Sequence, residues 1–218
     1  MKSLLIKDWK LLKNQRQFFG SMALILVIFL AVNQSPEFVI SYAVMILMLF
    51  TLSTIQYDEY ENGMSYLLTL PIGRKEYVLE KYVFGLLSAV ISGIVMLLLT
   101  AVLAKVRGAG FIPDDFLAAL VVAFLIASVM MAYTIPIRMK FGSEKSRIAT
   151  IGFMMVLFIL GFGVVKLLER NGRTVGEVFD KLDGLPIGML SAGMLGAGVV
   201  LLAISMAVSM RIIQKKEY

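Results

Sequence analysis

The sequence predicts an all-α protein that crosses a membrane six times and forms a single transmembrane domain over residues 1–218. The first observation is composition: 59% of the residues are hydrophobic, 17% are charged and the mean hydropathy is +0.87. Soluble domains are roughly half apolar and a quarter charged. The second is a set of six stretches without Asp, Glu, Lys or Arg, and the third is an uneven distribution of Lys and Arg.

The six uncharged stretches define the predicted spans. Each is near or above the roughly 20 residues that a helix needs to cross the hydrocarbon core. In chain order they are Gln17–Pro36, Phe38–Tyr57, Tyr82–Ala104, Phe116–Ile137, Ile148–Val165 and Gly184–Met210.

The Lys and Arg residues orient these spans. With the N-terminus placed inside, 15 of the 21 basic residues fall on the inner side and six on the outer side, whereas the acidic residues divide 8 to 7. This is the positive-inside pattern, and it predicts that both termini are cytoplasmic. The net charge of +6 is then explained by orientation, so we expect a lipid membrane and no nucleic acid as a partner.

The chain lacks the residues on which much enzyme chemistry depends. It contains neither Cys nor His, so thiol chemistry, the usual proton shuttle and the commonest metal ligand are absent. It has no P-loop or nucleophile-elbow pattern. We therefore expect no catalytic, metal-binding or cofactor-binding residue in this chain. The predicted spans also contain no charge that could couple an ion, although hydroxyls and carbonyls can still hold Na⁺.

The first 16 residues, "MKSLLIKDWKLLKNQR", predict an amphipathic elbow helix along the inner membrane surface. Leu4, Leu5, Trp9 and Leu12 share one face at helical spacing, and Trp suits the headgroup region. The alternative is a basic lead-in that only orients the first span. No small-residue cleavage site follows, so we do not expect a cleavable signal peptide.

The outer segment 166–186, "KLLERNGRTVGEVFDKLDGLP", predicts a short amphipathic helix before the sixth span. Thr174 and Glu177 match a capping box, and an apolar stripe follows. This helix would either line an exit path or lie at the membrane interface.

Two features of the spans predict helix geometry. In the sixth span, small residues at four-residue spacing favour close helix packing, within the chain or between two chains. These residues are Gly188, Ala192 and Gly196. In the fourth span, Pro136 should kink the helix or end it.

The segment 58–73, between the second and third spans, is predicted to be cytoplasmic. Its first part, "DEYENGMSYLLTL", predicts a helix with Tyr60, Met64, Leu67 and Leu68 on one face. The acidic residues of "DEYE" would fall in its first turn, where the helix dipole stabilises negative charge.

Gly63 would lie in the middle of that helix, where glycine costs about 1 kcal/mol relative to alanine. Close approach of another surface would explain it. Pro71 and Gly73 should end the helix, and "RKEYVLEKY" should lead into the third span. From the residues alone, the segment is either a docking element or an ordinary interfacial helix.

The pattern from Glu59 to Tyr82 resembles the first cytoplasmic loop of the permeases of type-2 ABC exporters. The matching positions are Glu59 or Glu61, Gly63, Leu67, Leu68, Leu70, Pro71, Ile72, Arg74 and Lys81. The layout of elbow helix, six spans and a helical segment before the sixth is also similar. The short, lysine-rich chain looks like bacterial permeases that export amphipathic peptides, such as the phenol-soluble modulin exporters.

The resemblance implies one transmembrane half of an exporter in a bacterial plasma membrane. A second permease chain, identical or paralogous, would complete the path, and a separate ABC ATPase would bind ATP and Mg. The substrate would be an amphipathic peptide or a lipid-like or drug-like molecule. Glu59, Tyr60, Glu61, Asn62, Gly63 and Met64 would contact the ATPase, and Pro71 and Arg74 would shape the loop.

Two other functions stay open at this point. The chain could be a non-transporting scaffold or sensor that binds an ATPase through the same loop. It could also be an ion-coupled secondary carrier that needs no ATPase.

Overall fold

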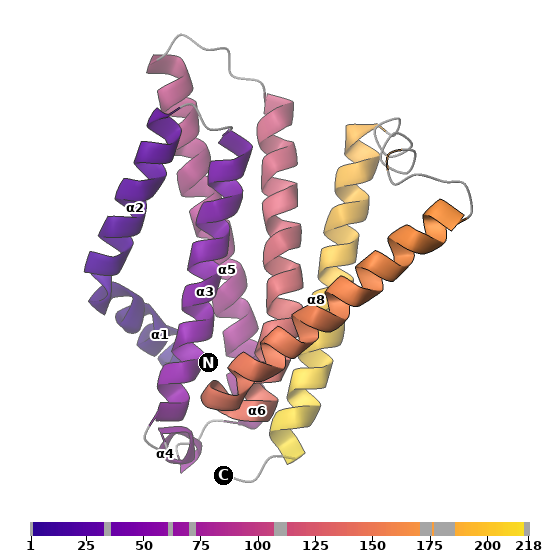
Figure 1. Cartoon of the computed structure of the whole chain (residues 1–218). Helices are drawn as coiled ribbons and strands as arrows, with labels where there is room; N and C mark the ends of the chain where they lie inside the picture. The colour runs from indigo at the N-terminus through magenta and orange to yellow at the C-terminus, as the bar shows by residue number, and fades with distance from the viewer. Residues whose placement is uncertain are drawn as a thin grey trace.

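A computed structural model of the chain describes residues 2–32, 36–60, 63–69, 73–106, 113–170, 176 and 186–215, and the regular structure in these ranges is entirely helical (Figure 1). The all-α prediction is confirmed for this part of the chain. The helices are α1 (Lys2–Asn14), α2 (Arg16–Ala31), α3 (Pro36–Glu59), α4 (Gly63–Thr69), α5 (Arg74–Val106), α6 (Pro113–Arg170) and α8 (Ile187–Lys215).

Within the described ranges, five helical segments are long and apolar enough to cross a membrane. They are Phe38–Glu59, Arg74–Val102, Leu117–Gly142, Lys145–Arg170 and Gly188–Lys215. These correspond to the second to sixth predicted spans, so the chain is a multi-pass membrane protein. The first predicted span coincides with α2, whose 16 residues extend about 24 Å. Because the hydrocarbon core is about 30 Å thick, a sixth span at α2 stays a prediction.

The helix α6 contains both the fourth and the fifth predicted spans. We call Leu117–Gly142 its first arm and Lys145–Arg170 its second arm. The helix continues past Pro136, so the proline does not end it, and the chain turns instead at Gly142 (φ 73°, ψ 176°). The second arm diverges from the first in Figure 1, and its apolar window is not buried against the rest of the chain.

Pro136 also frees a backbone carbonyl within α6. Because proline has no N–H, the carbonyl of Ala132 loses its helical donor. The hydroxyl of Ser205 in α8 donates to this carbonyl at 2.7 Å. The Tyr82 hydroxyl of α5 lies 2.6 Å from the Ser205 oxygen and 3.0 Å from that of Ser209. The carbonyl freed by the proline therefore takes part in a hydrogen-bonded contact among α5, α6 and α8.

The core lies between α3, α5 and the first arm of α6. Thr51 of α3 and Ser88 of α5 have their hydroxyl oxygens 3.3 Å apart, as expected for mild polar groups that join helices in a membrane. A Cβ at Gly85 would stand 2.5 Å from the Met131 methyl group and 3.3 Å from Thr51. Glycine at this position therefore lets α5 approach both neighbours.

The small residues proposed for helix packing in α8 face open space within this chain. No atom of the described structure lies within 4 Å of a Cβ built at Gly188 or Gly196, and Ala192 is exposed. The glycine that packs is Gly198, where a Cβ would stand 2.9 Å from the Phe124 ring of α6. The described part of the chain therefore does not use the predicted stripe for helix packing.

We predict that Gly142→Ala destabilises the protein by about 1–3 kcal/mol, because its φ and ψ lie in a region that glycine almost alone occupies. The added methyl group would also point toward the Glu59 carboxylate. Thermal unfolding in detergent measures the effect. Gly152→Ala, in the second arm with open space around it, is the matched control and should not be destabilising. Equal behaviour of the two variants would contradict the role of the turn.

Candidate functional site

The candidate site is the corner where α3 passes into α4, and the structure divides the predicted loop helix in two. α3 extends to Glu59, and α4 begins only at Gly63. Asp58 and Glu59 therefore lie in the last turn of α3, and the expectation that they lie in the first turn of a helix is wrong. The dipole disfavours negative charge at a helix C-terminus, so these carboxylates need cations nearby. Glu61 and Asn62 lie outside the described residues.

Gly63 is the first residue of α4, not a mid-helix glycine as expected. A Cβ at this position would stand 2.9 Å from the backbone oxygen of Asp58. The surface that approaches Gly63 is thus the end of α3 in the same chain. Glycine is required here because α4 folds back tightly against the helix that precedes it.

The two faces of the corner differ in their exposure to solvent. Met64 is 3% exposed and Leu67 is 8% exposed, and both belong to the hydrophobic core. Tyr60 is 70% exposed and Tyr66 is 73% exposed. Of the residues predicted to touch a partner, Tyr60 is therefore accessible, whereas Met64 anchors α4 to the bundle. Tyr66 was not among the predicted residues, although its place in an amphipathic segment could have suggested it.

Arg74 begins α5, and its guanidinium reaches the C-terminal end of α8. It donates to the carbonyl of Ile213 at 3.3 Å and to that of Gln214 at 3.2 Å. These are terminal helix carbonyls, which lack partners within the helix and which a cation stabilises. Arg74 thus ties the start of α5 to the end of α8. Pro71, the other residue predicted to shape the loop, lies outside the described residues.

A group of buried charges lies beside the corner, and its centre is Lys81 of α5. The side chains of Lys81 and Asp8 are both 0% exposed, and Lys81 Nζ lies 2.5 Å from Asp8 Oδ2 in α1. Lys81 Nζ also lies 2.8 Å from Asp58 Oδ2 and 3.1 Å from the Thr54 hydroxyl, both in α3. One ammonium group therefore connects α1, α3 and α5.

Further polar groups complete this cluster. Lys7 of α1 pairs with Asp58, and the Tyr77 hydroxyl donates to the same carboxylate at 3.2 Å. Glu80, which is also buried, has a carboxylate oxygen 3.5 Å from Lys81 Nζ. Asp58 lies at the C-terminal end of α3, where the helix dipole disfavours negative charge. Two lysines and the Tyr77 hydroxyl therefore stabilise its carboxylate.

The cluster changes the interpretation of α1. Leu4 is buried in the core and Trp9 is 53% exposed, so the face that meets the bundle includes Leu4 and Asp8 and excludes Trp9. Because α1 makes buried ion pairs with α3 and α5, it is not simply a basic lead-in to the next helix. Asp8 is the sole acidic residue among the first 16, which could have suggested a specific partner for it.

The described residues show no arrangement for metal chemistry. No group of three or more His, Cys, Asp or Glu side chains in that part of the chain is placed to hold a metal ion. The corner instead offers two exposed tyrosines, Tyr60 just after the end of α3 and Tyr66 on α4, beside a short helix that packs against α3.

The fold defines a multi-pass helical membrane protein with two exposed tyrosines at the α3–α4 corner. A family model described as "ABC-2 family transporter protein" matches residues 3–214, and the chain belongs to this family of ABC transporter permeases. Neither curated proteins nor solved structures give a significant match. Members of the family are membrane transport components that are not themselves catalytic, and membership implies partnership with an ABC ATPase subunit.

Proposed function

We propose that the chain is the membrane-spanning permease of an ABC exporter and that the α3–α4 corner is its attachment site for the ATPase. The observation that supports this most directly is the contrast within the corner. Tyr60, just after the end of α3, and Tyr66 of α4 are exposed, whereas Met64 and Leu67 hold α4 in the core. Exposed tyrosines on a fixed element are typical of binding hot spots.

The contacts around the corner explain how motion would reach the spans. α4 packs on the end of α3, and Lys81 joins α3 to α5 and α1. Arg74 joins the start of α5 to the end of α8. A displacement of α4 by a partner would therefore move the ends of three long helices together, instead of bending a loop.

In this proposal the α4 end of the bundle is cytoplasmic, with both termini on that side of a bacterial plasma membrane. The Lys and Arg distribution supports this orientation. ATP and Mg would be bound by the ATPase. A second permease chain would pair with this one, which is consistent with the unburied second arm of α6 and the open face of Gly188 and Gly196. The cargo would be an amphipathic peptide or a lipid-like or drug-like molecule.

Reconstitution tests the proposal against its alternatives. The chain is purified together with the ATPase encoded beside it and placed in liposomes, and a fluorescent amphipathic helical peptide serves as the probe. An exporter requires ATP for peptide accumulation and shows peptide-stimulated hydrolysis. Accumulation by this chain alone under an ion gradient would instead identify a secondary carrier. Co-purification with the ATPase without stimulation or accumulation would identify a scaffold or sensor.

A further inference from the structure

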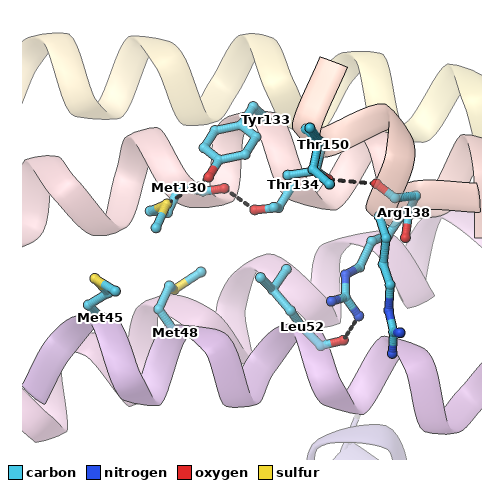
Figure 2. Close-up of a pocket in the computed structure, with 11 residues that line it drawn as sticks. Met45, Met48, Leu52, Met130, Tyr133, Thr134, Arg138 and Thr150 are labelled. Carbon is cyan, nitrogen blue, oxygen red and sulfur yellow. Dashed lines mark hydrogen bonds between the residues drawn. The ribbon is translucent and has the colours of Figure 1, made fainter. Parts of the chain in front are cut away.

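A cleft of about 400 Å³ opens between α3 and the two arms of α6 (Figure 2). Pockets that take small ligands are commonly roughly 300–1,000 Å³ in volume. The second arm forms one wall, and stacking of Tyr133 on Phe153, with ring centres 5.4 Å apart, holds this arm near the first. The residues that line the cleft are Met45, Met48, Leu52, Met130, Tyr133, Thr134, Arg138, Ser146, Arg147, Thr150 and Ile151.

The cleft is polar at one end and apolar at the other. Figure 2 places Met45, Met48 and Met130 on one side and Arg138 on the other, with Leu52 between them. Met130 and Arg138 are eight residues apart in the first arm, which corresponds to a separation of about 12 Å along the helix axis. The arginine end lies toward the Gly142 turn, and the methionine end lies deeper in the bundle.

The charged lining residues in the described part of the chain are two arginines. Arg138 donates to the backbone oxygen of Leu52 at 2.7 Å, which fixes its position, and a guanidinium carries four further N–H donors. Arg147, from the second arm, lies close enough to repel Arg138. Glu59 interacts with Arg138 from outside the cleft, so one positive charge remains in excess.

The apolar end is adaptable. Methionine side chains are flexible and polarisable, and they accommodate ligands of varied shape. Met48 is buried, whereas Met45 and Met130 are half-buried. The side chain of Met48 is therefore held by packing, and those of Met45 and Met130 can change conformation around a ligand. A hydrocarbon chain would displace water here at little cost, because the groups around it are apolar.

We propose that this cleft binds an amphiphile with one anionic headgroup, a phosphate or a carboxylate, and a single alkyl chain. The guanidinium groups of Arg138 and Arg147 hold the headgroup, and the alkyl chain lies along Leu52 toward Met45, Met48 and Met130. Arginine suits this role because its planar fork matches phosphate and carboxylate oxygens. That such a ligand is the cargo rests on the proposed function; the binding itself does not.

The test uses the full chain in phosphatidylcholine nanodiscs and dodecyl phosphate with a photoreactive diazirine at the end of its chain. Illumination followed by peptide mapping should place the label on the segments that contain Met45, Met48 and Met130. Unlabelled dodecyl phosphate and dodecanoate should compete, whereas dodecyltrimethylammonium and dodecyl maltoside should not. Labelling spread along residues 154–164 of the exposed second arm, outside the cleft, would overturn the proposal.

Variants separate a defined headgroup site from general attraction to a basic surface. Arg147→Gln should weaken competition by dodecyl phosphate about tenfold, the effect of one charge-assisted contact, while Arg147→Lys should retain most of it. Lys145→Gln, which removes an exposed charge two residues away outside the cleft, is the matched control and should change nothing. An equal effect of Lys145→Gln and Arg147→Gln would overturn the site.

Two further experiments test whether the cleft binds the alkyl chain. Thr150→Phe fills the cleft without changing its charge, and it should abolish tail labelling while the protein elutes and unfolds as the wild type does. Inorganic phosphate should not compete at the concentrations at which dodecyl phosphate does. Full competition by inorganic phosphate would show a site for free anions and would overturn the proposal for an amphiphile. None of these readouts uses ATP, so they can fail independently of the exporter assignment.

Discussion

Lys81→Met is expected to destabilise the protein by about 3–5 kcal/mol, which is the cost of removing one partner from a buried ion pair. The side chain of Lys81 is fully buried, and its ammonium contacts carboxylates from two other helices. Methionine keeps the length and flexibility of the side chain but not its charge. The variant would therefore leave Asp8 and Asp58 buried, with Lys7 as their remaining cation at this site.

Thermal unfolding in detergent and limited proteolysis both measure this effect. The melting temperature should fall, and a protease should release α1 at concentrations that leave the wild type intact, because Lys81 ties α1 to α5. Lys75→Met is the matched control, since Lys75 lies in the same helix and is exposed. Adding Asp8→Asn to Lys81→Met should recover part of the loss, because it removes one of the unpaired charges.

Two results would contradict this account of the cluster. If Lys81→Met and Lys75→Met unfold alike, the ion pairs contribute nothing measurable. If the double variant is less stable than the single variant by the full cost of Asp8→Asn alone, then Asp8 and Lys81 are not coupled, and α1 is held mainly by apolar contacts such as those of Leu4.

The long apolar helices could be predicted from the sequence because the bilayer imposes a length and an absence of charge on each span. Five such helices appear close to their predicted bounds. The extension of α5 back to Arg74 agrees with the helix expected over "RKEYVLEKY", whereas the sequence did not show that α3 continues to Glu59. Those extensions bring Asp58 and Lys81 together with Asp8, next to Thr54 of the second predicted span. A method that defines spans by missing charge places such residues in loops, and their pairing depends on helix packing that a local pattern does not contain.

The positions at which helices turn were also hard to predict, because they depend on contacts between helices. Pro136 is a strong local breaker, yet α6 passes through it because Ser205 of α8 satisfies the carbonyl that it frees. Gly142 is the residue that turns the chain. A single glycine in a charged stretch gives no sign of its φ. At Gly63 the family resemblance identified the motif position, but the sequence did not show that the Asp58 carbonyl lies next to it.

The second large effect is expected at the exposed face of the corner. Replacing Tyr60 and Tyr66 together by alanine should lower the affinity for the ATPase by at least about tenfold, because tyrosines at the centre of an interface often contribute more than 1 kcal/mol each. Both side chains are more than two-thirds exposed, at 70% and 73%, so their loss should leave the melting temperature close to that of the wild type. Binding of the ATPase to the chain in nanodiscs, and cargo-stimulated hydrolysis, are the two measurements.

Phe38→Ala is the control for this experiment. Phe38 is also exposed and aromatic, and it lies in α3, but at the end of that helix farthest from the corner. It should leave ATPase affinity unchanged. Gly63→Trp is a poorer test than the tyrosine variants, since any side chain at Gly63 meets the backbone of Asp58 and disturbs the fold of the corner itself. If the double tyrosine variant binds the ATPase and supports stimulated hydrolysis as the wild type does, the α3–α4 corner is not the attachment site. The contacts of Lys81 and Arg74 would then stabilise the bundle without transmitting motion from an ATPase.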